Sequence, residues 1–300
     1  MSYILGLDVG GSAIKYALMD KEANFIEKGT IPTPLDTKEH FIEAIVSIYN
    51  KYEDKLEGLA LSMPGNINSD TGHIDTPGAL EFNYNTNIFD SIHEKIQNIK
   101  IFVQNDGKCA ALAELWMGNL KDVKNGAVLV LGSGIGGGLI ANRELLTGSH
   151  FFAGELSYLI ENPESVGFEN VFAMHGGTGA LCMRTAALKG LKAEDVDGKQ
   201  VFEWIKQQDK DALEAFDHMT THLATQIFNI QCFIDPEIVC IGGGVSKQPL
   251  VVEKINEKLN KIYEKMPFPT PRVKVTTCKY NNDSNLIGAL YNYIQHDKGE

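Results

Sequence analysis

The sequence has few cysteines, and no two of them are close together. It contains five among 300 residues, an odd number scattered along the chain: Cys109, Cys182, Cys232, Cys240 and Cys278. This pattern argues against a disulfide scaffold and against a metal knuckle built on paired cysteines, and it suits a reducing compartment. The N-terminus lacks the charged and apolar regions of a signal peptide, and no apolar run is long enough to cross a bilayer. We therefore expect a cytoplasmic protein.

Positive charge is scarce as well. The 27 lysines and arginines face 39 aspartates and glutamates, which gives a formal net charge of -12. Such an acidic balance argues against nucleic acid or an anionic membrane as a partner. It is compatible with a phosphorylated ligand, because backbone amides and a metal ion hold phosphate without a basic surface. The length corresponds to about two domains, and 43% hydrophobic residues are enough to form a buried core.

Strands and helices are expected to alternate along the chain. Buried strands are predicted at Tyr3–Val9, Leu59–Ser62, Ile101–Val103, Val128–Leu131 and Ile238–Ile241. A strand, a glycine turn and a second strand occur near residue 10 and again near residue 134, which suggests two similar units and an internal duplication. The whole pattern predicts an α/β protein with mostly buried sheets.

Three glycine-dense loops each follow a predicted strand: Asp8-Val9-Gly10-Gly11-Ser12, Gly132–Gly138 and Gly242-Gly243-Gly244. Glycines let backbone N–H groups approach phosphate oxygens without interference from a Cβ atom. Asp8 could orient Mg²⁺ through water, since Mg²⁺ keeps much of its hydration shell. Lys15 is a candidate neighbour of phosphate, although an exposed strand lysine is the more common case. Any one loop could be an ordinary turn, but three together favour a nucleotide site.

The second loop contains a GxGxxG match at Gly132, Gly134 and Gly137. A dinucleotide-binding loop of this type must lead directly into a helix. Here Leu139–Arg143 instead predicts a second strand closed by a turn, even though Glu155 lies near the spacing expected of a ribose-binding acid. We therefore reject the dinucleotide interpretation.

Asp106 stands at the end of the strand Ile101–Val103 and just before the helix-forming run Ala110–Trp116. A carboxylate at such a place can accept a proton from a substrate hydroxyl group as its oxygen attacks a phosphoryl group. An isolated aspartate would more often cap the following helix. Asn105 offers a donor and an acceptor suited to a sugar hydroxyl group, and Glu155 supplies a second carboxylate.

Six motifs stand in a characteristic order and spacing: Asp8-Val9-Gly10-Gly11-Ser12, Ser62-Met63-Pro64-Gly65, Asn105-Asp106 followed by Ala110-Ala111-Leu112-Ala113-Glu114, the Gly132–Gly138 loop, Ala153-Gly154-Glu155 and Gly242-Gly243-Gly244. In this combination the chain resembles the ROK family of sugar kinases from Ile4 to about Ile294. No single motif is specific, but the combination is.

The resemblance implies a two-lobed, actin-like (ribonuclease H-like) α/β ATPase fold with the active site in a cleft between the lobes. The smaller lobe would comprise residues 1–117, with a C-terminal helix of about residues 285–300 packing back on it, and the larger lobe residues 118–284. The resemblance also implies ATP and Mg²⁺ as cofactors, a sugar as substrate and a homodimer.

The resemblance assigns roles to individual residues as well. Asp106 would be the general base, and Asp8 would hold Mg²⁺ through water. The residues implied to bind the sugar are Gly65, Asn105, Asp106, Glu155 and Tyr158. The residues predicted to bind the nucleotide, by the resemblance for the glycine loops and by their place beside them for Asp8 and Lys15, are Asp8, Gly10, Gly11, Ser12, Lys15, Gly132, Ser133, Gly134, Gly136, Gly242, Gly243 and Gly244.

The chain departs from the family pattern at its zinc site. Many members have a Gly-His pair and a CxCGxxGC run, where this chain has Ser157-Tyr158 and Ala173–Ala180. His175 alone cannot form a tetrahedral site, so we predict no structural zinc. His218 and His222 stand four residues apart, but neighbouring acids do not complete a metalloprotease pattern.

The departures also affect the expected substrate. Tyr158 and Cys182 occupy positions where the family has a histidine and a glutamate near the anomeric carbon of the sugar. We expect a substrate other than free glucose, either a β-glucoside phosphorylated at its 6-hydroxyl group or an N-acetylated hexosamine such as N-acetylmannosamine. The alternatives are a glucokinase, a catalytically inactive sugar sensor, and an actin-like assembly or chaperone ATPase that needs no sugar.

Overall fold

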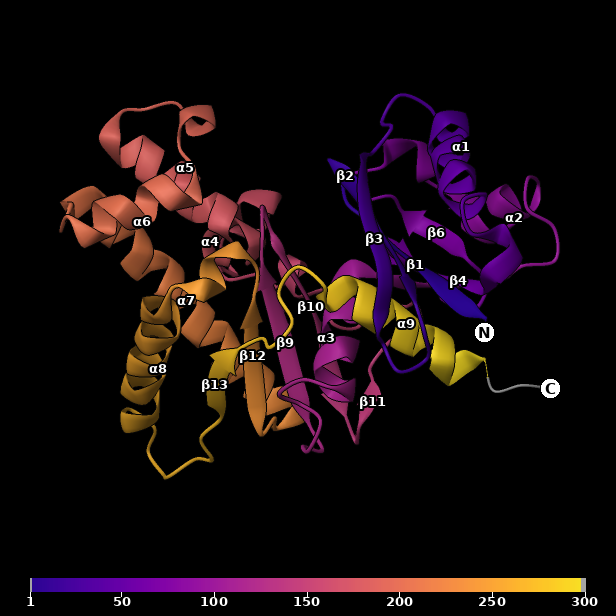
Figure 1. The fold of residues 1–300 in the computed structure, drawn as a ribbon. Coiled ribbons are helices and arrows are strands. Elements are labelled where there is room, and N and C mark those ends of the chain that lie inside the picture. Colours follow the sequence, from indigo (N-terminus) through magenta and orange to yellow (C-terminus); the bar gives the residue numbers. More distant parts are fainter. Residues whose placement is uncertain (1, 298–300) are drawn as a thin grey trace. The chain divides into compact units, whose positions relative to one another are not determined.

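The computed structural model describes residues 2–297 and divides the chain into two compact units (Figure 1). The first unit consists of Met1–Gly118, Leu145–Ala153 and Asn282–Glu300, and the second of Asn119–Glu144 and Gly154–Asn281. The prediction assigned residues 145–153 to the larger lobe, whereas here they group with the first unit. Side chains of that unit bind the backbone of this segment, as described below.

The first unit is built on a five-stranded sheet with the order β3-β2-β1-β4-β8. Its strands are β1 (Tyr3–Val9), β2 (Ala13–Met19), β3 (Phe25–Pro32), β4 (Leu56–Met63) and β8 (Lys100–Asn105). The strands β1, β2 and β3 pair antiparallel, whereas β1, β4 and β8 are parallel. A small second sheet contains β5 (Asn66–Ile67), β6 (His73–Thr76) and β7 (Thr86–Asn87).

Alternate residues of β1 enter two different cores, since successive side chains of a strand point to opposite faces. Leu5 and Leu7 pack with α1 (Lys38–Tyr49) and α2 (Ile88–His93). Ile4 instead packs with residues of α3 (Asp106–Trp116) and α9 (Ser284–His296). The C-terminal helix therefore belongs to the core of the first unit (Figure 1).

The second unit repeats the strand arrangement of the first. Its sheet has the order β11-β10-β9-β12-β13, formed by β11 (Glu144–Leu145), β10 (Ile135–Ala141), β9 (Gly126–Leu131), β12 (Ile238–Gly242) and β13 (Lys274–Thr277). The strands β9 and β10 form an antiparallel hairpin, and β9, β12 and β13 are parallel. This repetition confirms the prediction of two similar units.

The helices described in the second unit are α4 (Ala173–Gly176), α5 (Thr178–Lys189), α6 (Gly198–Lys206), α7 (Lys210–Ile234) and α8 (Pro249–Glu264), and the other four each pack against α7. One apolar core joins Leu129 of β9, Ile241 of β12, Phe216 of α7 and Ile255 of α8. The helix α7 ends at Ile234, and its C-cap Asp235 has a φ of 45°, which breaks the helix before Pro236, as the sequence predicted.

Short 3₁₀ turns complete the elements: Glu53–Lys55, Glu81–Asn83, Leu156–Tyr158, Phe168–Asn170, Ala193–Asp195 and Gly244–Lys247. Over residues 2–297, no helix combines the length and the apolar composition that crossing a membrane requires.

Candidate active site

Asp8 lies near the end of β1 in the first unit, and only 5% of it is exposed. Its Oδ1 accepts hydrogen bonds from Ser62 Oγ (3.2 Å) and Asn285 Nδ2 (2.9 Å), and its Oδ2 accepts one from Lys15 Nζ (3.2 Å). Lys15 faces Asp8 across the β1–β2 pair. Lys15 is therefore the ion-pair partner of Asp8, and a role at phosphate stays a prediction.

The glycine turn between β1 and β2 is held by backbone and hydroxyl bonds. Gly10 N–H donates to Ala13 O (3.0 Å), and the Thr33 hydroxyl donates to Gly10 O (2.6 Å). Thr33 N–H donates to Ser12 O (3.2 Å). The start of the turn and its last residue are thus tied to β2 and to the end of β3, which gives Gly11 a defined position.

Asn105, not Asp106, caps helix α3. Asn105 Oδ1 accepts a hydrogen bond from Lys108 N–H (3.1 Å), which is the usual geometry of an N-cap. Asp106 is the first residue of the helix, is half-buried, and its Oδ1 accepts from Gly107 N–H (2.7 Å). The capping role that an isolated aspartate would most often have is therefore taken by its neighbour. The positive end of the helix dipole stabilises the Asp106 carboxylate.

Gly65 supports Asn105 from the turn after β4. Its carbonyl accepts a hydrogen bond from Asn105 Nδ2 (3.0 Å). The φ of Gly65 is +106°, and a Cβ atom there would lie 2.0 Å from Thr76 O, so only glycine fits. Gly65 positions Asn105 through its carbonyl group. A direct contact of Gly65 with the sugar stays a prediction.

Lys108 is a residue of this region that the sequence did not single out. It is 1% exposed, and its Nζ donates to Phe151 O (2.6 Å). Asn66 Nδ2 donates in the same way to His150 O (3.1 Å). These two side chains hold the segment of residues 145–153 on the first unit. A buried lysine is rare unless its charge is compensated, but no sequence pattern marks Lys108, because only the structure shows that it is buried.

The second unit contains a cavity of about 750 Å³, within the usual size range of small-molecule sites. It is lined by residues of the β9–β10 loop, of α5, of α6 and of the loop after β12, among them Gly132, Ser133, Thr178, Cys182, Lys199 and Gly244. Cys182, which the family pattern associates with the sugar, lies here among the glycine loops.

The glycines at this cavity are of two kinds. Gly243 has a φ of +90°, and a Cβ atom on it would lie 2.2 Å from Leu131 O, so packing requires glycine there. A Cβ atom on Gly244 would meet nothing within 4 Å, and one on Gly132 would meet only Gly134 O, at 4.0 Å. Nothing in the packing of the described residues demands glycine at Gly132 or Gly244, so the space beside them is available to a ligand.

The predicted nucleotide residues of the second unit divide accordingly. Among the described residues, those that line the cavity include Gly132, Ser133 and Gly244. Gly134, Gly136, Gly242 and Gly243 are not among them. The first of these closes the loop by accepting from Gly132 N–H (3.0 Å), and the next two belong to β10 and β12. These four residues shape the strands and turns behind the cavity.

The start of α5 is part of this site, although the sequence did not predict it. Gly179 N–H donates to Gly132 O (3.1 Å), and the Thr178 hydroxyl donates to Leu131 O (3.1 Å). A Cβ atom on Gly179 would lie 2.4 Å from Ser133 O, which explains the glycine. The Gly-rich composition of residues 176–179 was the available signal.

Glu155 and Tyr158 belong to the second unit, in and beside the 3₁₀ turn Leu156–Tyr158. The Ser157 hydroxyl donates to Ile135 O (2.5 Å) and accepts from Ile135 N–H (3.3 Å), which ties this turn to β10. Tyr158 is 50% exposed, so its ring is accessible to a ligand. The sugar-binding roles of both residues stay predictions.

The dinucleotide interpretation of the GxGxxG match is wrong, as the sequence indicated. The element that follows the loop is the strand β10, which pairs with β9, and not a helix. The pyrophosphate site of a dinucleotide fold needs a helix N-terminus at that place.

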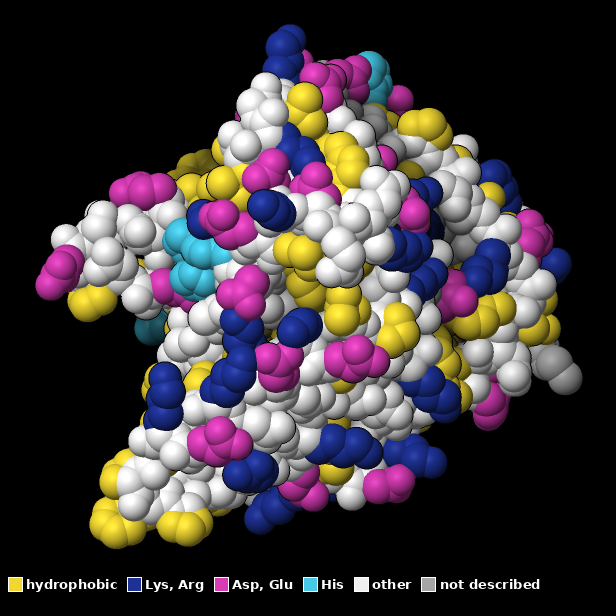
Figure 2. Space-filling view, turned by 90° about the vertical axis from the view of Figure 1, so that its left-hand side faces the viewer, with side chains coloured by type: hydrophobic (Ala, Val, Ile, Leu, Met, Phe, Trp, Pro, Cys, Tyr) yellow, Lys and Arg dark blue, Asp and Glu magenta, His cyan; other side chains and the backbone are white. Residues whose placement is uncertain are grey.

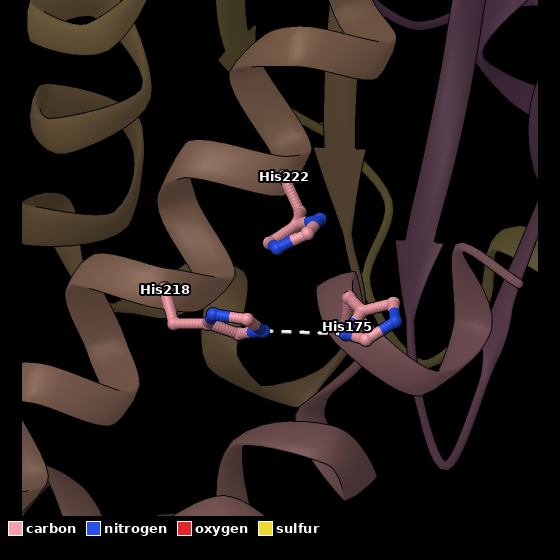
Figure 3. A group of neighbouring side chains, drawn as sticks. All are labelled: His175, His218 and His222. Atoms are coloured by element: carbon pink, nitrogen blue, oxygen red, sulfur yellow. Dashed lines mark hydrogen bonds between the residues drawn. The ribbon is translucent and has the colours of Figure 1, made fainter. Parts of the chain in front are cut away.

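Three histidines of the second unit lie together, which corrects the expectation that His175 stands alone. The ligand atoms of His175, His218 and His222 are all within 4.8 Å of one another (Figure 3). Burial lowers the pKa of His218 to about 4 and also holds the pKa of His175 below its usual value, and the charge of His222 adds to both effects. The imidazoles of His175 and His218 are therefore neutral at pH 7.

The two sheets of equal strand order, each with a glycine turn between its first antiparallel strands, define the class of the protein as an actin-like α/β ATPase fold. The model of the ROK family matches residues 4–296, and the chain belongs to that family. Both the predicted fold class and the recognised family are confirmed.

Three similar proteins illustrate the relationship. A "Beta-glucoside kinase" of Listeria monocytogenes is 26% identical over 98% of each chain. A "Glucokinase" of Halalkalibacterium halodurans is 29% identical over 95% of this chain and 93% of its own. A crystal structure of a ROK family protein from Streptococcus pneumoniae in complex with sucrose superposes with a TM-score of 0.89 at 27% identity, covering 99% of both chains.

Proposed function

We propose that this ATP-dependent carbohydrate kinase of the ROK family phosphorylates the 6-hydroxyl group of a β-glucoside, with Asp106 as its general base. The observation that carries the catalytic assignment is the pair of roles at the start of α3. Asn105 caps the helix, and Asp106 therefore stands at the first helical position, where its carboxylate is fixed beside the helix N-terminus.

In the proposed reaction the Asp106 carboxylate accepts the proton of the sugar hydroxyl group. The O–H bond of that hydroxyl breaks as its oxygen forms a bond to the γ-phosphorus of ATP. The bond between this phosphorus and the β,γ-bridging oxygen breaks, and ADP leaves. Asn105 fixes the position of Asp106 at the start of α3 through its hydrogen bonds to Lys108 N–H and Gly65 O.

The residues of the second unit suit the nucleotide. The cavity of about 750 Å³ brings Gly132, Ser133 and Gly244 together with Thr178 at the start of α5. At two of its glycines a side chain would meet open space, which fits a ligand that lies against bare backbone. We propose that this cavity receives ATP, with backbone N–H groups directed at its phosphates.

Asp8 suits a hydrated magnesium ion. A carboxylate has about four lone-pair directions, and Lys15, Ser62 and Asn285 use three of those of Asp8. One direction remains for a water molecule in the shell of Mg²⁺. When bound, the ion would neutralise negative charge on the phosphate oxygens of ATP.

The choice of a β-glucoside rests on two supports. The similar Listeria protein, matched over 98% of each chain, is named a β-glucoside kinase. The similar Streptococcus protein was crystallised with sucrose, in which the anomeric carbon of glucose is substituted in the α configuration, so it supports a substituted anomeric carbon and not the β configuration. In addition, Tyr158 stands where the family has a histidine, and its half-exposed ring offers an apolar surface to a substituent at that carbon. Free glucose, as for the Halalkalibacterium relative, is the second candidate.

A coupled assay of ADP release with Mg²⁺ tests the substrate. Cellobiose, salicin, glucose, N-acetylglucosamine and N-acetylmannosamine are compared by kcat/KM, and we expect a β-glucoside to have the highest value. A highest value for free glucose or for an N-acetylhexosamine would overturn the assignment of the substrate but not of the class. The absence of sugar-dependent ADP release with every acceptor would overturn the catalytic role as well.

A further inference from the structure

The face of the molecule shown in Figure 2 carries a surface group of histidine side chains, coloured cyan. His218 and His222 lie one turn apart on α7, so they point to the same side of that helix. His175 comes from α4, which is far away in the sequence. All three are half-buried, and their rings converge (Figure 3). An ion from solvent could therefore reach their nitrogens.

The spacing of the nitrogens fits a metal ion. His175 Nδ1 and His218 Nε2 are 3.2 Å apart and share a hydrogen bond. In a tetrahedral site with Zn–N bonds of 2.0–2.1 Å, two ligand nitrogens lie about 3.3–3.4 Å apart. These two nitrogens are therefore close enough to bind one ion, which would lie to one side of the line between them and replace their hydrogen bond.

A carboxylate orients the third histidine. His222 Nδ1 is hydrogen-bonded to Glu161 Oε2, and Glu161 Oε1 accepts from Gln226 Nε2 (3.0 Å). Burial raises the pKa of Glu161, but the hydrogen bonds from His222 and Gln226 outweigh burial and leave its pKa below the usual value. Since Nδ1 of His222 donates to a carboxylate, its Nε2 is the nitrogen left to bind a metal. A carboxylate behind a ligand histidine is the common arrangement of protein metal sites.

The balance of nearby charge also permits a cation. Glu161 supplies a negative charge directly behind His222. The nearby cation Arg184 is paired with Glu214 (3.2 Å). The alternative interpretation is a cluster of three packed imidazole rings without a ligand, in which the rings of His175 and His222 stack with centroids 4.7 Å apart at 16°.

The site differs from the zinc site of the family pattern. The positions of that pattern in this chain are Tyr158, Ala173, His175 and Ala180, of which only His175 can bind zinc. The other two histidines come from α7, which contributes nothing to the family pattern. The residues present therefore do not fit the cysteine-based site.

We propose that His175, His218 and His222 form a site for a divalent transition metal ion, Zn²⁺ first among them. Three imidazole ligands suit zinc and its first-row neighbours, and a fourth position is left for water. The bound ion ties α4 to α7 within the second unit. The helix α4 leads directly into Gly177, whose backbone lies against the Gly132–Gly138 loop: a Cβ atom added to Gly177 would lie 3.0 Å from Gly134 O. By fixing α4, the ion therefore also holds this loop beside the cavity.

The test uses the untagged full-length chain after treatment with a chelator. Co²⁺ is added as a spectroscopic probe, and Zn²⁺ binding is measured by calorimetry and by the shift in Tm. We expect one ion per chain, the visible absorption of a tetrahedral or five-coordinate cobalt site, displacement of Co²⁺ by Zn²⁺, and a rise in Tm of several degrees. No binding, or a cobalt spectrum of purely octahedral type, would overturn the proposal.

Variants locate the ion. His218→Gln and His222→Gln should each weaken binding at least tenfold, and Glu161→Gln should weaken it about tenfold by releasing His222. His40→Gln is the matched control, because His40 also pairs with a carboxylate, Asp36, but lies in the first unit. Equal binding by all four variants would place the ion elsewhere and refute the site. Glu161→Gln keeps all three histidine rings. If the histidine variants lose the metal signal but Glu161→Gln binds the metal as the unchanged protein does, the orienting role of Glu161 is refuted.

Discussion

The side chain of Asn105 caps helix α3, and its neighbour Asp106 is consequently the first residue of the helix. The amide of Asn105 is bound on both sides, by Lys108 N–H and by Gly65 O. Asp106 is thereby held at a fixed place without having to serve as the cap itself. Asn105 and Asp106 are both polar and adjacent in the sequence, but only Asn105 caps the helix.

Replacement of the proposed base should abolish turnover without unfolding the protein. We expect Asp106→Asn to lower kcat by about 100- to 10,000-fold, because proton transfer by a positioned base contributes about that much. The KM for sugar and the Tm should change little, since the cap is supplied by Asn105. Asp90→Asn is a suitable control, as Asp90 is an exposed acid in the first turn of α2. A loss of activity in the control equal to that in Asp106→Asn would contradict the assignment.

Loss of the cap should instead affect stability. Asn105→Ala should lower the free energy of unfolding by about 1 kcal/mol, the typical cost of removing an N-cap side chain. Asn105→Ser keeps an acceptor for Lys108 N–H and should recover most of that loss. Urea unfolding measures both. If Asn105→Ala and Asn105→Ser are equally destabilised, the bond to Gly65 O and not the cap is the dominant contribution.

The neighbouring glycines Gly243 and Gly244 should respond in opposite ways to alanine. Gly243→Ala places a Cβ atom 2.2 Å from Leu131 O at a positive φ, and we expect a marked fall in Tm. Gly244→Ala meets only open space, so the Tm should be kept while the KM for ATP rises. Thermal unfolding and the coupled assay separate the two effects. An unchanged KM for ATP in Gly244→Ala would count against nucleotide binding in this cavity.

The buried Lys108 should govern the segment of residues 145–153. Lys108→Met keeps the bulk of the side chain but leaves Phe151 O without the ammonium donor. A buried polar group that loses its partner costs about 1–3 kcal/mol. We expect faster hydrogen exchange in residues 145–153, with exchange in the second unit unchanged. Lys100→Met serves as control, because the Lys100 side chain is 59% exposed. Equal exchange in both variants would show that this bond is not what holds the segment.

Much of the architecture could be predicted from the sequence because it follows from local patterns. The apolar strand Tyr3–Val9 has the predicted bounds in the structure, and the glycine turn after it is present. The end of α7 before Pro236 depends on backbone geometry that two or three residues decide. The strand after the Gly132–Gly138 loop could likewise be distinguished from a helix by its short apolar run and the turn behind it.

Other features lay beyond any local pattern. The bond between Asn285 and Asp8 joins residues 277 positions apart, and the pattern of the last helix does not indicate which of its residues faces β1. Lys108 looked like an ordinary helical lysine, and only the structure shows that its side chain is buried and donates to Phe151 O. The start of α5 lines the cavity because Gly179 lies close to Ser133 O, which no local sequence pattern indicates.

The sequence by itself determined the α/β class, the duplicated hairpins, the family and the candidate base, because strand periodicity, glycine turns and motif order are local or linear properties. Only the tertiary structure decided that Asn105 caps α3 and that His175 meets His218, 43 positions further along the chain, together with His222. Both depend on which groups folding brings close together: Lys108 N–H lies 3.1 Å from Asn105 Oδ1, and the ligand atoms of the three histidines lie within 4.8 Å of one another. No linear spacing carries that information.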